Sequence, residues 1–364
     1  MDRRQILLGG GAVALAGAGA AYAGRRHMGS MEEYEASVAE TRSVLTASPQ
    51  LRDFIRYATL APNGHNTQPW RFRIRQNSID VLPDFSRRTP VVDPDDHHLF
   101  VSLGGAAENL ALAATARGRR GDLSFNPGNS GSVAFAFGDG RTAEPIMVDA
   151  IPRRQSTRED YDGRPVSPDD VQRLIAAAAV PGVDLILLTD RPKIERVSDL
   201  VIAGNSTQMA DAAFVRELKT WLRFSPRQAI ETGDGLFSAA SGNPVLPAWL
   251  GPTLFDWAVS AKSENEKYVR QLRSSAGVAV FVGEHPDADH WVRVGRSSQR
   301  FALAATAVGL KIAHINQPVE VATLRPELAS IVGLPGRRPD IVMRFGYGPA
   351  TPYSARRSVA AVLA

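Results

Sequence analysis

The pattern of apolar and polar residues predicts a helix and then a strand pair close to the start of the chain. Ser48-Pro49 is typical of a helix start, with an N-cap residue followed by proline at the first helical position. The apolar residues that follow recur at helical spacing: Leu51, Phe54, Ile55 and Ala58. Beyond a short turn-rich stretch, apolar residues at 70, 72 and 74 alternate with arginines, and a second apolar run covers 79–82. This period of two predicts a hairpin with one apolar face.

The same criteria predict further elements along the chain. We expect a loop over 83–96, short strands over 122–150 and a covering segment rich in glycine, serine and proline over 232–252. The predicted helices lie at 99–117, at 168–178 after a second Ser-Pro start, at 193–223 and at 291–309. The remaining strands are predicted at 183–189, where a buried strand is expected, and at 278–282 and 340–345.

A six-residue repeat indicates two related halves. The run Ala-Leu-Ala-Ala-Thr-Ala occupies 111–116 and again 302–307, and a glycine follows each copy, at Gly118 and Gly309. A Ser-Pro helix start and a predicted strand precede each copy. We interpret the chain as two tandem α+β modules, residues 31–150 and 151–364, that form an intrachain pseudo-dimer. A site between the modules would combine residues from both.

Composition and charge narrow the function classes. The chain has 364 residues, 44% of them hydrophobic, and a formal net charge of +4 without a basic run, so we expect a globular protein with no nucleic-acid partner. It has no cysteine, which excludes disulfides, thiolate nucleophiles and iron-sulfur clusters. His97-His98 are adjacent, and we expect them in a solvent-exposed loop or helix start with no metal bound.

The N-terminus has the layout of a twin-arginine signal peptide. Arg3-Arg4 precedes a weakly apolar run rich in glycine and alanine, and Ala21-Tyr22-Ala23 resembles a cleavage site. We assign residues 1–24 to this signal, with the twin-arginine export machinery as partner and a periplasmic or other extracytoplasmic location. The run is too short and too glycine-rich for a convincing membrane span, so no stable span is expected after signal removal.

The best candidate for a binding site is the stretch 61–72, Ala-Pro-Asn-Gly-His-Asn-Thr-Gln-Pro-Trp-Arg-Phe, called the motif loop below. Pro62 cannot continue a helix, and Asn63-Gly64 favours a tight turn with positive φ. The stretch is dense in groups that can bond a planar polar heterocycle, including Asn66 and Gln68. The alternative is an Asx-type turn ahead of a strand.

A second candidate is the arginine-rich stretch 153–158, Arg-Arg-Gln-Ser-Thr-Arg. Guanidinium groups supply forked donors that match phosphate oxygens, and hydroxyl groups add further donors. Arg356-Arg357 near the C-terminus is the other arginine pair that could contact a phosphate. A solvated basic loop explains the stretch 153–158 equally well when it is considered alone.

These stretches resemble the nitroreductase superfamily, and in particular its Acg-like FMN-binding branch, in which one chain mimics the usual homodimer. The motif loop is similar to the family's flavin-binding pattern P-S-x-x-N-x-Q-P-W-x-F, and 154–158 is similar to its phosphate-binding R-x-S-x-R element. Gly346-Tyr347-Gly348 before Arg356-Arg357 resembles the family's C-terminal strand and flavin-contacting arginine. Asn316-Gln317-Pro318 resembles a further element of that branch. Asn63-Gly64 departs from the family pattern, which has serines there, and the second module has no Q-P-W loop.

The resemblance implies an FMN-binding oxidoreductase that passes electrons from a reduced donor, NAD(P)H or another, to a small electrophile such as a nitroaromatic or a quinone. It implies one FMN per chain and no side chain that acts as a nucleophile, and we assign no catalytic residue. The residues expected to bind the cofactor are Pro62, Asn63, Gly64, Asn66, Arg154, Ser156, Arg158, Asn316, Gln317 and Arg356. Two alternatives stay open: a flavin-binding or sequestering protein with little turnover, and a structural α+β domain without cofactor.

Overall fold

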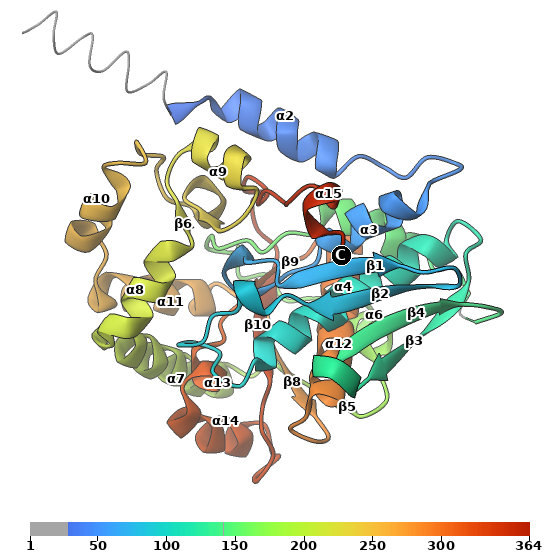
Figure 1. The fold of residues 1–364 in the computed structure, drawn as a ribbon. Helices are drawn as coiled ribbons and strands as arrows, with labels where there is room; N and C mark the ends of the chain where they lie inside the picture. The colour runs from blue at the N-terminus through green and yellow to red at the C-terminus, as the bar shows by residue number, and fades with distance from the viewer. Residues whose placement is uncertain (1–27, 141) are drawn as a thin grey trace, which may run out of the picture.

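The computed structural model describes residues 28–140 and 142–364. The predicted signal peptide, residues 1–24, therefore lies outside the described residues. Two antiparallel four-stranded sheets flank the helices of 97–115 and 288–307, and further helices surround them (Figure 1). This is an α+β architecture. Within the described ranges, no helix is both long enough and apolar enough to cross a membrane.

The two four-stranded sheets have the same strand order. The first sheet runs β1 (Trp70–Ile74), β2 (Ser78–Pro83), β4 (Ser132–Phe137), β3 (Gly121–Asn126). The second runs β5 (Val183–Leu188), β8 (Gly277–Gly283), β10 (Ile341–Gly346), β9 (Lys311–His314). In both sheets the order is first, second, fourth, third along the chain. A long helix follows the second strand each time, α4 (His97–Thr115) in one half and α12 (Ala288–Ala307) in the other.

The predicted strands form, but one of them is less buried than expected. The hairpin after the motif loop is confirmed as β1 and β2, with Phe72 paired to Val81. Strand β8 is buried along its whole length because apolar clusters cover both of its faces, so its sequence shows no alternation. The prediction of a buried strand at 183–189 is wrong: β5 is an edge strand that pairs with β8 alone, and most of it is half-exposed.

Helices α4 and α12 pack closely because glycines lie at their crossing. A Cβ at Gly104 would overlap the carbonyl oxygen of Val292, and one at Gly295 would overlap that of Val101. The small-residue repeats 111–116 and 302–307 lie at the ends of these two helices. Glu108, fully buried on α4, pairs with Arg296 and Arg300 of α12. The centre of the molecule therefore joins the two halves tightly.

The remaining helices surround this core. In the first half these are α2 (Met31–Thr41), α3 (Leu51–Thr59) and α5 (Pro145–Ala150). In the second half they are α6 (Pro168–Ala178), α7 (Arg191–Ala210), α8 (Ala212–Thr220), α9 (Pro226–Thr232), α10 (Gly251–Ala258), α11 (Ala261–Arg273), α13 (Gln317–Glu320), α14 (Arg325–Ile331) and α15 (Val359–Val362). Two short strands, β6 (Leu222–Arg223) and β7 (Leu236–Phe237), form a third sheet within the segment that contacts the motif loop.

The C-terminal segment crosses back onto the first sheet. The backbone N-H of Ala364 donates to the carbonyl of Phe72, and Leu363 forms a bridge with the same strand (Figure 1). The last residues of the chain thus lie beside the C-terminal end of the motif loop. This crossing places Arg356 and Arg357 against residues that precede them by almost 300 positions.

Candidate functional site

The motif loop has an unusual backbone. It contains one short 3-10 helix, Gly64–Asn66, and three of its non-glycine residues have positive φ: His65 at 45°, Asn66 at 53° and Gln68 at 54°. Non-glycine residues with positive φ cost free energy and persist where the surrounding structure fixes them. The loop is therefore held in one conformation by its contacts.

Asn66 and Gln68 supply those contacts. The Asn66 Nδ2 donates to the carbonyls of Gly235 at 3.0 Å and Ala355 at 3.1 Å, and its Oδ1 accepts from Arg356 Nη1 at 2.9 Å. Gln68 donates to the Gly233 carbonyl at 2.8 Å. The buried Asn66 side chain is thus already bonded to protein, whereas Pro62 and Asn63 are half-buried and Gly64 is exposed.

The C-terminal end of α3 gathers two of the predicted arginines. Arg154, 2% exposed, donates to the carbonyl of Leu60 at 3.2 Å, and Arg356 Nε donates to that of Thr59 at 2.6 Å. Carbonyls at a helix C-terminus carry partial negative charge and attract cations. Arg154 Nη1 also reaches the Ser156 hydroxyl at 3.4 Å. The structure therefore brings Arg154, Ser156, Arg356 and Asn66 together.

A third buried arginine, Arg42, stands beside this pair. Burial lowers the pKa of Arg154 to about 9, and the charge of Arg42 adds to the effect. Burial, with the charges of Arg42 and Arg154, holds the pKa of Arg356 well below its usual value. Within the described residues none of the three forms an ion pair with a carboxylate. A buried cation without a counterion is costly, and an anion bound here would remove that cost.

Arg158 has a free guanidinium. Across the part of the chain that the structure describes, no acceptor for its side chain is found, although burial lowers its pKa. His65 and His314 lie near Arg158, and its positive charge disfavours the protonated form of both imidazoles. Burial is the larger cause, and it lowers the pKa of His65 to about 4 and that of His314 to about 3. Arg158 therefore lies among neutral imidazoles with its donors unused.

Asn316 and Gln317 begin α13 at the end of the second sheet. The Asn316 Oδ1 accepts from the Val342 N-H at 2.9 Å, and its Nδ2 lies 3.3 Å from His98 Nε2. Gln317 is 8% exposed, and its Oε1 has no partner within the described ranges. Tyr268 lies near Gln317 and Arg158, and burial raises the pKa of Tyr268 to about 12. Gln317 and Arg158, both predicted to bind the cofactor, therefore lie near the same residue, Tyr268.

The expectation that His97 and His98 are solvent-exposed is wrong. His97 is 1% exposed at the start of α4, and its Nε2 lies 2.9 Å from Asp340 Oδ1. His98 Nδ1 lies 3.6 Å from Asp93 Oδ1. Burial favours the neutral imidazole of His98, but the hydrogen bond and charge of Asp93 outweigh it and raise the His98 pKa. Asp93 also accepts the backbone N-H groups of 98 and 99. Although His97 Nε2 makes no hydrogen bond among the described residues, we assign the group Asp93, His97 and His98 no metal.

Sequence reasoning missed three residues of this region: Arg42, His65 and His314. Arg42 follows a helix in a polar stretch, and nothing local indicates that it is buried. His65 lies inside the motif loop at a position where the family pattern accepts any residue. His314 lies two residues before Asn316, at the end of β9, and proximity to that element was the available signal.

The arrangement suits an anionic ligand with a planar polar part. Arginines from both halves and the Ser156 hydroxyl lie near the end of α3 and the motif loop. The donors without a protein acceptor in the described chain are Arg42 Nε, Arg154 Nε and the guanidinium of Arg158. Phosphate is the common ligand of such forked donors.

Comparison with known proteins agrees with this chemistry. The chain is 27% identical over 328 residues to "Putative NAD(P)H nitroreductase Rv3131" of Mycobacterium tuberculosis, a match that covers 86% of this chain and 90% of the relative. "Putative NAD(P)H nitroreductase acg" of the same organism is 24% identical over 313 residues, with 82% and 89% covered. The chain is thus similar, along most of its length, to two proteins that are named as NAD(P)H nitroreductases. No family model matches it.

Solved structures give a more distant likeness. The FMN-dependent nitroreductase NfnB from Mycobacterium smegmatis in complex with NADPH aligns with a TM-score of 0.38 and 12% identity, over 60% of this chain and 92% of that one. A nitroreductase with bound FMN from Desulfitobacterium hafniense aligns with a TM-score of 0.38 and 14% identity, over 58% and 94%.

Proposed function

We propose that this chain is an FMN-binding oxidoreductase of nitroreductase type. It would transfer electrons from a reduced donor, NAD(P)H or another, through FMN to a small electrophile such as a nitroaromatic or a quinone. The observation that carries the proposal is the group of arginines Arg154, Arg158 and Arg356, none of which has a carboxylate partner among the described residues. The names of the relatives, NAD(P)H nitroreductases, support the same activity.

The residues present fit FMN. Arg154, Ser156 and Arg356 would hold the phosphate, because they combine two guanidiniums with a hydroxyl next to α3. Pro62, Asn63, Gly64, Asn66, Arg158, Asn316 and Gln317 would line the ring and the chain that links it to the phosphate. The free Gln317 Oε1 and the unused donors of Arg158 are groups that such a ligand would satisfy.

Bound FMN supplies the redox chemistry, and the protein supplies position and electrostatics. Arg158 favours negative charge beside it, because its guanidinium is not neutralised by a carboxylate in the described chain. His65 and His314 stay neutral near pH 7, since burial lowers their pKa values. The motif loop offers its backbone from a conformation that Asn66 and Gln68 fix before any ligand arrives.

We also propose that the two halves are tandem copies of one module that form an intrachain pseudo-dimer, as the repeat predicted. The shared strand order and the matching positions of α4 and α12 support this. The motif loop belongs to the first module, 31–150, and Arg154 and Arg158 belong to the second, 151–364. A complete site would therefore need residues from both modules and would bind one FMN per chain.

Export by the twin-arginine route is proposed from the sequence of residues 1–24 alone. The expected result is that the protein reaches the extracytoplasmic fraction, and that Arg3→Lys with Arg4→Lys retains it in the cytoplasm. Recovery of the double variant outside the cytoplasm would contradict this proposal. Free NADPH is scarce outside the cytoplasm, so an exported protein is expected to use another reduced donor.

The absorbance spectrum of the purified protein tests FMN binding. The expected result is a yellow protein, or one that becomes yellow with FMN, with one flavin per chain after gel filtration. A colourless protein after incubation with FMN would contradict the proposal and leave a structural domain. Stopped-flow mixing with NADPH, NADH or a chemical reductant, followed by a quinone, then tests turnover. Flavin that no nicotinamide bleaches and that a quinone does not reoxidise after chemical reduction would favour the sequestering alternative.

A further inference from the structure

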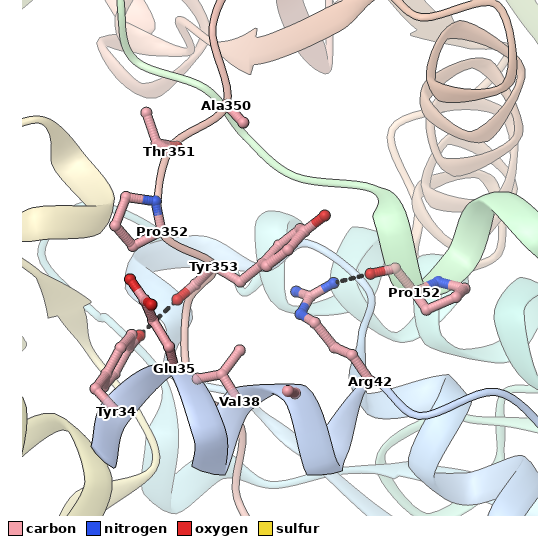
Figure 2. A pocket seen from close by; sticks show the side chains of 10 residues that line it. Tyr34, Glu35, Val38, Arg42, Pro152, Ala350, Thr351, Pro352 and Tyr353 are labelled. Atoms are coloured by element: carbon pink, nitrogen blue, oxygen red, sulfur yellow. Dashed lines mark hydrogen bonds between the residues drawn. The ribbon is translucent and has the colours of Figure 1, made fainter. Parts of the chain in front are cut away.

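A cavity of about 620 Å³ lies between α2 and the C-terminal segment, and Arg42 forms part of its wall (Figure 2). Its walls come from Tyr34, Val38 and Ala39 of α2, from Pro152, and from residues 350–353. Pockets for small ligands in proteins are typically about 300–1,000 Å³ and mostly apolar, with a few placed polar groups. This cavity matches both criteria and contains none of the predicted cofactor-binding residues.

Arg42 is the polar group of the cavity. It is 8% exposed, and its Nη1 donates to the Pro152 carbonyl at 2.7 Å and the Arg154 carbonyl at 3.3 Å (Figure 2). Its Nε is buried without a partner. Within residues 28–140 and 142–364, no carboxylate forms an ion pair with it, and Nη2 makes no hydrogen bond. Two carbonyls and an aromatic face therefore leave part of this buried cation unsatisfied.

Tyr353 supplies that aromatic face. The Arg42 guanidinium carbon lies 4.0 Å from the centre of the Tyr353 ring, which is a cation-π contact. The ring and the guanidinium share one wall, and the side chains of Val38 and Ala39 and the two proline rings at 152 and 352 form apolar surface around them. A planar ring could lie on this surface with an acidic group toward Arg42.

The walls are held in place without a ligand. The Tyr34 hydroxyl donates to the Tyr353 carbonyl at 2.5 Å (Figure 2). The fully buried Tyr34 ring packs with its centre 4.4 Å from that of Phe237. Gln155 donates to the Thr351 carbonyl at 2.6 Å and accepts from its N-H at 3.2 Å. A cavity with fixed walls costs little conformational entropy to fill.

The charge balance selects the class of ligand. Among the residues that line the cavity, Arg42 carries the positive charge and Glu35 on the rim a negative one, whereas Arg154 and Arg356 do not line it. A singly charged anion is therefore favoured over a phosphate ester, whose second charge would face Glu35 without a partner. We propose that this cavity is a second small-molecule site that takes a planar aromatic monoanion, such as an aryl carboxylate, with its carboxylate on Arg42 and its ring beside Tyr353. This inference does not depend on the proposed oxidoreductase activity.

Equilibrium dialysis with salicylate, read by its fluorescence, tests the site on the full chain as purified. Salicylamide has the same shape without the charge, and it should bind at least about tenfold more weakly, as expected for loss of a hydrogen bond between charged groups. Ala39→Trp fills the cavity and should weaken salicylate binding by a similar factor. Ala36→Trp is the control, because Ala36 is an exposed residue of the same helix that does not line the cavity.

The outcomes separate this site from the cofactor site. Salicylate should bind flavin-loaded protein without changing the flavin spectrum, and FMN should not displace it. Absence of binding, equal binding of salicylamide, unchanged binding by Ala39→Trp, or competition with FMN would each overturn the proposal. Failure to bind FMN would overturn the proposed function and leave this result unaffected.

Discussion

Arg356 donates from Nη1 to the Asn66 Oδ1 at 2.9 Å and so joins the C-terminal segment to the motif loop across 290 residues of sequence. The same amide donates to the carbonyls of Gly235 and Ala355. One side chain in an unusual backbone conformation therefore holds together the loop, the segment over it and the end of the chain. The site exists as a unit only when all three are in place.

Asn66→Ala should lower the free energy of unfolding by about 2–4 kcal/mol. The change removes three buried hydrogen bonds and places a residue with a Cβ, and no compensating side-chain bond, at φ of 53°. Denaturant unfolding followed by tryptophan fluorescence measures the effect.

Asn66→Gly is the matched control, because it loses the same bonds but tolerates positive φ. It should be more stable than Asn66→Ala by about 1 kcal/mol. Equal stability of the two variants would show that the backbone conformation is not strained. Wild-type stability of both would show that the Asn66 hydrogen bonds do not hold the three segments together.

Substitution by alanine at the adjacent glycines Gly104 and Gly105 of α4 should change the stability of the protein in opposite directions. Gly104→Ala should destabilise by about 2 kcal/mol or more, because its Cβ would overlap the Val292 carbonyl and force α4 and α12 apart. Gly105→Ala should be neutral or stabilise by up to about 1 kcal/mol, because its nearest neighbour would be 3.6 Å away and alanine favours a helix. Thermal unfolding of both variants checks this, and equal effects would mean that the helix crossing tolerates a wider separation.

The sequence predicted what local periodicity determines. Helix α3 and the β1–β2 hairpin follow from spacing over a few residues, and Gly118 and Gly309 end up at φ of 79° and 82° after the repeated helices. The burial of the strand at 183–188 was predicted wrongly, because an apolar composition does not indicate whether a strand will have neighbouring strands on one side or on both. Edge position is decided by the sheet as a whole.

The site was predictable as residue types and less so as contacts. Arg154 and Arg356 were identified from their motifs, but their shared position at the end of α3 depends on a chain crossing that no local pattern encodes. His97 was expected on the surface because it adjoins the predicted loop over 83–96. Its actual neighbour is Asp340, which directly precedes β10 in the second half of the chain. Such long-range pairs come from packing.

Arg158→Gln should weaken FMN retention by about tenfold to a hundredfold. The substitution keeps most of the side-chain length but removes the charge that no carboxylate in the described chain neutralises, and a charged hydrogen bond is worth about 1.5–3 kcal/mol. Fluorescence titration of flavin-free protein with FMN gives the affinity. Arg153→Gln, a change of an exposed arginine in the same stretch, is the control and should bind like the wild type. Unchanged affinity of Arg158→Gln would place the flavin elsewhere.

Flavin-free protein should lose stability as the pH falls from about 7.5 to 5, in part because of His65 and His314. Their pKa values are about 4 and about 3 in the folded chain, against an ordinary value of about 6.5 in the unfolded one. Below pH 6.5 the unfolded chain therefore binds protons that the folded chain does not, which favours unfolding by about 1–2 kcal/mol per histidine at pH 5.

His98, whose pKa is raised, acts in the opposite direction: its stabilisation is present below pH 6.5 and is lost as the pH rises through its folded value. Denaturant unfolding at several pH values should show a weaker acid loss in His314→Gln than in the wild type, whereas the exposed His285→Gln should follow the wild type. An identical pH profile for His314→Gln would mean that His314 is not held neutral by burial.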